Sequence, residues 1–187
     1  YMRHLGGLYI VQGRFDEAES LINKAYRLCL ENYGEKHHKT LSGLSNLTYL
    51  YLARAQYDKA EPAIKKLLKL RREVLGQNHR DTIRSMAQLG SLYWDQGHFD
   101  KGEKYLQEAI YRSEKTYGSN NYHTISLKRI QVFVHLKKER TDEAQTELLK
   151  LIEIAKELNK NQPYILDDLF YIQGEIDYHK GLFKKTE

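Results

Sequence analysis

One short phrase recurs along the chain at a constant interval. It begins at residues 13, 55, 97, 139 and 181, where the sequence reads GRFDEAE, AQYDKAE, GHFDKGE, ERTDEAQ and GLFKKTE. Each copy starts 42 residues after the one before it. Self-similarity at a fixed period marks a tandem array in which each unit is one supersecondary element. We therefore predict one elongated array whose core is a continuous strip between stacked units.

The apolar spacing predicts that each unit is a pair of helices. In the first unit, MRHLGGLYIVQ forms one helix and Gly13 ends it. The second helix runs to about Tyr33, and Thr40 is expected to cap the helix that follows. The predicted buried stripe of this second helix consists of Phe15, Ala18, Leu21, Ile22, Ala25 and Leu28. The pattern repeats in the later units and predicts an all-α chain.

The same pattern sets the expected domain organisation. We expect a single array over residues 1–187, with units at about 1–36, 37–78, 79–120, 121–162 and 163–187. The chain has only two prolines and no Ser/Gly-rich tract, so nothing in it resembles a linker. Because the first and last units are partial, we expect the chain to be a fragment of a larger protein.

The composition narrows the classes of partner. A net charge of +5 arises from 30 basic and 25 acidic side chains, a modest excess that favours nucleic acid only weakly. The densest basic segment is interleaved with leucines, so we interpret it as the solvated face of an amphipathic helix. It consists of Lys65, Lys66, Lys69, Arg71 and Arg72. Apolar runs fall far short of the roughly 18 residues that span a bilayer. We expect neither a nucleic-acid nor a membrane partner.

Catalytic residue types are present without a catalytic arrangement. The eight histidines include His79, which we interpret as a structural link residue, but they form no H-E-x-x-H motif and no Cys/His cluster. Phosphate-binding and dinucleotide-binding glycine motifs are also missing. The single cysteine, Cys29, fits a small buried hydrophobe and is compatible with a reducing compartment such as the cytoplasm. We predict a non-enzyme with no catalytic residue, metal or cofactor.

Short motifs within the units resemble a known family. LGGLY at 5–9, LTYLY at 47–51 and LGSLY at 89–93 follow the L-G-x-x-Y pattern of tetratricopeptide repeats, whose units are usually about 34 residues long. Small residues match on the second helices at Ala18, Ala60, Gly102 and Ala144. The longer unit, with LGQNHRDT at 75–82, is similar to the repeats of kinesin light chains, with Arg80 in place of Pro. The resemblance implies a right-handed α-solenoid of antiparallel helix pairs.

The resemblance also implies a binding site. In this family the first helix of each pair lines a concave groove that receives extended peptides. The groove positions in this chain would include Arg3, Asn46, Tyr49, Arg84, Gln88, Ser91, Trp94, Arg129, Phe133 and Lys137. The basic residues would favour an acidic segment, and the two amides could hold a peptide backbone. Trp94 and Phe133 either anchor a ligand or cover a neighbouring helix.

Three hypotheses about the function of the chain follow. The first is an adaptor or scaffold that binds an acidic peptide motif. The second is a structural or regulatory array that packs on another domain of its parent protein or self-associates. The third is direct nucleic-acid binding through basic helix faces.

In the fourth unit Val132 replaces the small residue and His135 replaces Tyr, so we expect shifted packing there.

Overall fold

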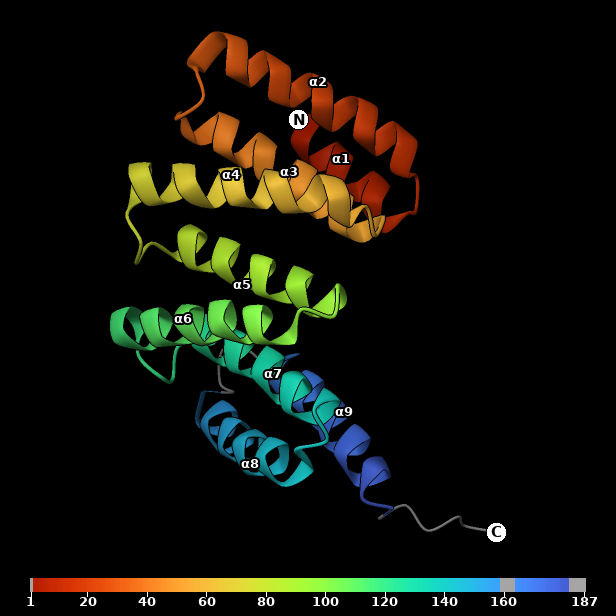
Figure 1. Ribbon diagram of the computed structural model, residues 1–187, viewed down its shortest axis with the longest axis vertical. Helices are drawn as coiled ribbons and strands as arrows, with labels where there is room; N and C mark the ends of the chain where they lie inside the picture. The colour runs from red at the N-terminus through yellow and green to blue at the C-terminus, as the bar shows by residue number, and fades with distance from the viewer. Residues whose placement is uncertain (1, 159–163, 182–187) are drawn as a thin grey trace. The chain divides into compact units, whose positions relative to one another are not determined.

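The computed structural model describes residues 2–158 and 164–181 (Figure 1). The described residues form helices joined by short turns, and no strand occurs among them. The helices are α1 (Met2–Val11), α2 (Phe15–Tyr33), α3 (His38–Ala53), α4 (Tyr57–Leu75), α5 (Arg80–Asp95), α6 (Phe99–Tyr117), α7 (Tyr122–Lys137), α8 (Thr141–Leu158) and α9 (Tyr164–His179). Most of the fifth copy of the recurring phrase, at 182–187, lies outside the described residues.

The helices keep the 42-residue interval of the sequence. Helices α3, α5, α7 and α9 begin at residues 38, 80, 122 and 164, and we call these, together with α1, the A helices. Helices α2, α4, α6 and α8 begin at residues 15, 57, 99 and 141, and we call these the B helices. The prediction of an all-α chain built from helix pairs is confirmed.

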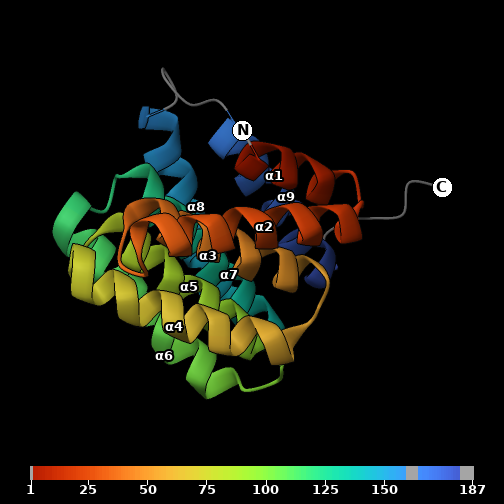
Figure 2. The ribbon, with the colours of Figure 1, turned by 90° about the horizontal axis from the view of Figure 1, so that it is seen from above.

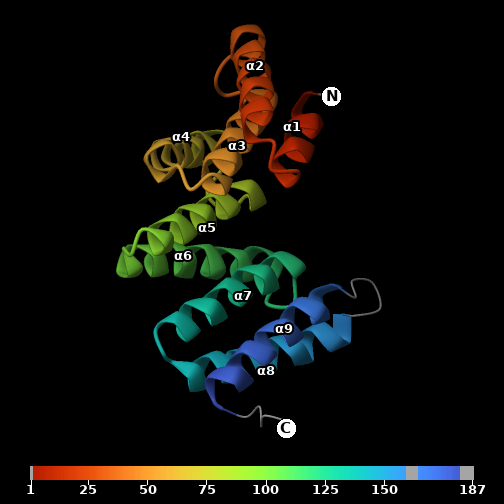
Figure 3. The ribbon, with the colours of Figure 1, turned by 90° about the vertical axis from the view of Figure 1, so that its right-hand side faces the viewer.

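Contacts divide the chain into two compact parts, which we call unit 1 (residues 1–105) and unit 2 (residues 106–187), with the boundary inside α6. These two numbered units differ from the 42-residue units of the sequence, which we continue to call the first to fifth units. In unit 1 each helix from α1 to α5 packs against the next one, and α1 also contacts α3. In unit 2, α8 packs against both α7 and α9. Figures 2 and 3 show these neighbouring helices within each unit. Each unit is therefore a set of antiparallel helices laid side by side.

Each unit has its own apolar core. One buried cluster of unit 1 is formed by Ile10, Ala18, Ile22, Leu41, Leu44, Leu47, Leu50, Leu67 and Leu70. A buried cluster of unit 2 is formed by Ile125, Val132, Ala144, Leu148, Leu151, Ile152, Ala155, Leu166, Leu169, Ile172 and Ile176. Leu28 of the predicted stripe is instead exposed, because α2 packs on α1 and α3 and no described helix covers its outer face.

The links between units correct one prediction. Thr40 was expected to cap α3, but the N-cap is His37, whose imidazole accepts a hydrogen bond from the Lys39 amide at 3.3 Å. His79 caps α5 in the same way, which confirms its structural role. Thr40 lies inside the first turn, where its hydroxyl donates to the Cys29 carbonyl. The threonine ties the A helix to the preceding B helix, and the cap prediction was wrong.

The basic segment of α4 is also not wholly solvated. Arg71 is only 3% exposed, and its guanidinium donates to the Asp81 carbonyl at 3.1 Å and to Ser85 Oγ at 2.6 Å. Burial lowers the pKa of Arg71 to about 10, so the group stays charged near neutral pH. Arg71 is therefore a polar link between α4 and α5, and the solvated face excludes it. Cys29, predicted to be buried, is half-buried.

Candidate functional site

The predicted site residues of unit 1 lie on two A helices. Tyr49 on α3 is 53% exposed, although the helix that carries it is packed into the core. Asn46 on the same helix is half-buried. On α5, Arg84 is exposed, whereas Gln88 and Ser91 are half-buried. We call these five residues the A-helix face of unit 1.

Arg84 already has a partner on its own helix. Its guanidinium donates to the Asp81 carboxylate at 2.8 Å, three residues earlier in α5. Both side chains keep access to solvent, Arg84 being half exposed. The A-helix face therefore carries a compensated cation, and its positive character is weaker than the sequence suggests.

Trp94 lies against the next helix. Its ring centroid is 4.6 Å from that of Phe99, the first residue of α6. A Cβ built on Gly102 would lie 2.3 Å from Trp94 Cδ1, so the indole occupies the space that a side chain would need. The half-buried Trp94 thus covers a neighbouring helix, which was one of the two interpretations of this residue. Its inclusion in a peptide site stays a prediction.

The remaining predicted residues belong to other parts of the chain. Arg129, Phe133 and Lys137 lie on α7 in unit 2, where Phe133 and Lys137 are exposed and Arg129 is half-buried. Arg3 belongs to α1, but its side chain lies outside the described residues. The structure therefore groups the predicted residues into one set on α3 and α5 and a separate set on α7.

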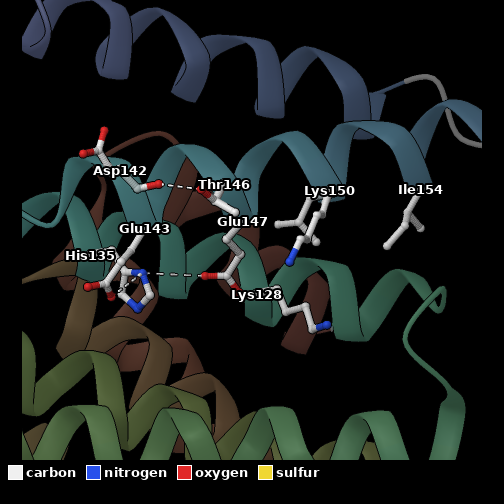
Figure 4. A pocket seen from close by; sticks show the side chains of 9 residues that line it. Lys128, His135, Asp142, Glu143, Thr146, Glu147, Lys150 and Ile154 are labelled. Carbon is white, nitrogen blue, oxygen red and sulfur yellow. Dashed lines mark hydrogen bonds and ion pairs between the residues drawn. The ribbon is translucent and has the colours of Figure 1, made fainter.

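A pocket in unit 2 was not predicted. It has a volume of about 600 Å³ and opens between α7 and α8 (Figure 4). Its lining residues are Lys128, His135, Asp142, Glu143, Thr146, Glu147, Lys150, Leu151 and Ile154. The sequence analysis noted His135 as an unusual residue but gave no role to the charged residues around it. The signal that could have found two of them is the 42-residue register, which aligns Lys128 with Met86 and Glu147 with Tyr105 of the unit before.

The charges of this pocket are arranged around one histidine. His135 Nδ1 lies 3.8 Å from a Glu147 carboxylate oxygen and 3.9 Å from one of Glu143. Burial raises the pKa of Glu147, and the nearby Lys128 and Lys150 only partly oppose this effect. Figure 4 shows the imidazole and the two carboxylates facing one another across the gap between the helices. The pocket therefore holds a half-buried carboxylate that favours a nearby cation.

The described residues include neither a candidate metal site nor a candidate membrane-spanning helix. They contain no group of His, Cys, Asp or Glu side chains that could hold a metal ion. A search of the same residues finds no helix with the length and apolarity of a membrane span.

Helix pairs repeated at a constant interval define the class of α-solenoid scaffolds, which serve protein–protein interaction. Residues 1–73 and 49–115 match the tetratricopeptide repeat family, so the match extends over more than half of the chain. The chain belongs to the tetratricopeptide repeat family, whose members are typically non-enzymatic scaffolds. No curated protein matches it.

Solved structures agree with this fold. The chain is similar to BtubC (BKLC) from P. vanneervenii, with a TM-score of 0.81 and 21% sequence identity over 96% of this chain and 72% of that one. It is also similar to the kinesin-light-chain-type TPR-like repeats of a Podosopora anserina protein. In that comparison the TM-score is 0.71 and the identity 15%, over 93% of this chain and 94% of the other. At such identities the likeness concerns the fold alone.

Proposed function

We propose that the chain is a scaffold module in which the A-helix face of unit 1 binds an extended, acidic segment of a partner protein. The observation that carries the proposal is Tyr49, a large aromatic side chain held at the surface by a well-packed helix. Tyrosine offers much contact area at a small entropic cost, and residues of this kind dominate binding energies at interfaces. A cytoplasmic location belongs to the same proposal and is supported by the single free thiol of Cys29.

Two amides of the A-helix face suit an extended backbone. Asn46 and Gln88 are half-buried on α3 and α5, and each offers both a donor and an acceptor. Gln88 Oε1 has no hydrogen-bond partner among the described residues. Rotation of this amide toward a peptide therefore breaks no hydrogen bond of its oxygen. Peptide N–H groups are the natural donors for such an acceptor.

Arg84 supports a preference for acidic ligands. Its ion pair with Asp81 joins two solvent-accessible groups three residues apart. Pairs of this kind contribute at most about 1 kcal/mol. A ligand carboxylate can therefore replace Asp81 at little cost, and a bidentate Arg–carboxylate pair has favourable geometry.

The test is fluorescence anisotropy with the whole chain and an array of short acidic peptides. Tyr49→Ala and Arg84→Glu should each weaken binding by about tenfold, because each removes an anchor of the ligand. The matched control is Arg27→Glu, which makes the same charge change at an exposed position of α2. Unchanged affinity in both A-helix variants, or an equal loss in the control, would contradict the proposal.

One observation favours the second hypothesis, an array that packs on another domain or on a second copy. Helix α9 exposes Phe170 and, at 67%, Tyr171. Adjacent exposed aromatic residues are typical of a surface that another protein covers. Sedimentation velocity over a range of chain concentrations separates self-association, which depends on concentration, from packing on another domain.

A further inference from the structure

We propose that the contact between α7 and α8 is a protonation-dependent joint, in which charged His135 binds Glu143 and Glu147 and holds the two helices together. The proposal concerns unit 2 alone and goes beyond peptide binding by unit 1. It rests on the geometry of the pocket and on a comparison of corresponding positions in the third and fourth units.

The third unit makes the same helix contact with aromatic rings. Tyr93 on α5 is buried, and its ring lies 5.8 Å from that of Tyr105 on α6. Lys101 lies above the Tyr93 ring, with Nζ 5.7 Å from the centroid. The contact thus pairs an electron-rich ring with a cation and with a second ring.

In the fourth unit the three corresponding positions hold side chains of different charge. One repeat later, the positions of Tyr93, Tyr105 and Lys101 are held by His135, Glu147 and Glu143. His135 is 13% exposed and lies within 4 Å of both carboxylates. A ring that can become a cation has replaced the electron-rich ring, and two anions have replaced its neighbours. Because all three positions changed in a complementary way, the arrangement suits the charged form of His135.

Several other cations lie around His135, and three of them pair with carboxylates other than Glu147. Lys128 on α7 pairs with Glu114 of α6 at 2.5 Å, and Lys180 pairs with Asp142 at 2.6 Å. Arg140 lies 3.8 Å from Glu143, whereas Lys150 also lines the pocket and is exposed. The cations around the pocket therefore partly balance its anions, and protonated His135 adds the missing charge next to Glu147.

The sign of the pH effect follows from these contacts. Burial raises the pKa of Glu147 because the carboxylate loses hydration, and a cation beside it opposes that rise and keeps the carboxylate charged. Protonation of His135 beside two carboxylates favours the closed joint. His135 therefore stabilises the α7–α8 contact as the pH falls, and this stability is lost as the pH rises through the pKa of His135 in the closed joint. The joint thus responds in the opposite direction to ordinary acid denaturation.

The joint has a consequence for the surface of α7. This helix carries Arg129, Phe133 and Lys137, the predicted binding residues of unit 2. Loosening α8 removes the support on which the inner side of α7 packs. Protonation of His135 therefore determines how firmly these residues are presented to a ligand.

The test is amide hydrogen exchange of α8, measured by NMR in the whole chain at about pH 5.5 and about pH 8, on either side of the ordinary histidine pKa. Exchange rates are corrected for the intrinsic effect of pH. Protection of the α8 amides should rise at the lower pH by up to about tenfold, the factor that a difference of one pKa unit between the closed and open states gives. Equal or lower protection at the lower pH would overturn the proposal.

Variants make the test specific. His135→Phe removes the titrating ring and should abolish most of the pH response, whereas His123→Phe, in the same helix, should keep it. The double variant His135→Tyr with Glu147→Tyr restores the ring pair of the third unit. It should be protected to the same extent at both pH values, which controls for folding. A pH response that survives in His135→Phe would overturn the assignment to His135.

Discussion

At the scale of single residues, the third unit shows a matched exchange of size between two helices. Trp94 occupies a position that holds Ile10 and Leu52 in the two preceding units. Gly102 occupies a position that holds alanine in the first, second and fourth units. The larger residue on α5 is therefore accommodated by the loss of one methyl group on α6, as close packing requires.

Gly102→Ala should destabilise the chain by about 1–2 kcal/mol. The new Cβ would lie 2.3 Å from Trp94 Cδ1 and 2.8 Å from the Gly90 carbonyl oxygen, and that backbone oxygen has little room to move. Overpacking of this kind costs about 1–3 kcal/mol, from which the better helix propensity of alanine recovers up to about 1.

The matched control for this variant is Gly174→Ala on α9. A Cβ at Gly174 meets nothing within 4 Å, so the gain in helix propensity should appear alone. Thermal unfolding followed by circular dichroism compares the two variants. The same melting temperature for both would show that Trp94 does not fill the space above Gly102.

Sequence reasoning reached these residues only in part. The sequence analysis placed Trp94 at a groove position from which it could cover a neighbouring helix, and it placed Gly102 among the small residues of the second helices. It did not connect the two, because the connection depends on which side chain crosses from α5 to α6. Tyr49 was named from the register alone, and its exposure is a property of the packed helices.

At the scale of helices, the sequence predicted where the helices end, but it did not predict which side chains cap them or link them. The second helix was predicted to end at about Tyr33, and the residues with positive φ after α2 and α4 are glycines, Gly34 and Gly76. The cap of α3 was misassigned, since threonine is a common N-cap and histidine a rare one. Arg71 was misassigned because a basic residue next to other basic residues is usually solvated.

Two variants of Arg71 should differ in their effect on stability. Arg71→Ala leaves a cavity between α4 and α5 and should cost about 2–3 kcal/mol. Arg71→Met fills most of this space without a buried charge and should cost less than about 1 kcal/mol. Ser85 also donates to the Asp81 carbonyl at 3.2 Å, so this oxygen keeps a donor in both variants.

Urea unfolding followed by circular dichroism measures both changes. The informative result is which of the two variants has the lower free energy of unfolding. If Arg71→Met proves as unstable as Arg71→Ala, the charge itself, rather than the volume of the side chain, holds α4 against α5.

At the scale of the whole molecule, the 42-residue interval predicted a tandem array, and the L-G-x-x-Y motifs indicated the family. The polar pocket of unit 2 escaped prediction for a physical reason. Glu143, Glu147 and Lys128 look like ordinary surface charges on amphipathic helices. They stand out only when aligned with Lys101, Tyr105 and Met86 of the preceding unit. A repeat protein therefore has to be read across its units as well as along its chain.

The central claim is that the A helices of unit 1 form the ligand-binding face. NMR chemical-shift mapping tests it most directly, by titrating the whole chain with an acidic peptide and, separately, with its lysine-substituted counterpart. The account predicts shifts of the α3 and α5 amides near Tyr49 and Gln88 with the acidic peptide, and much smaller ones with the lysine peptide. Shifts confined to the B helices, or equal responses to both peptides, would contradict it.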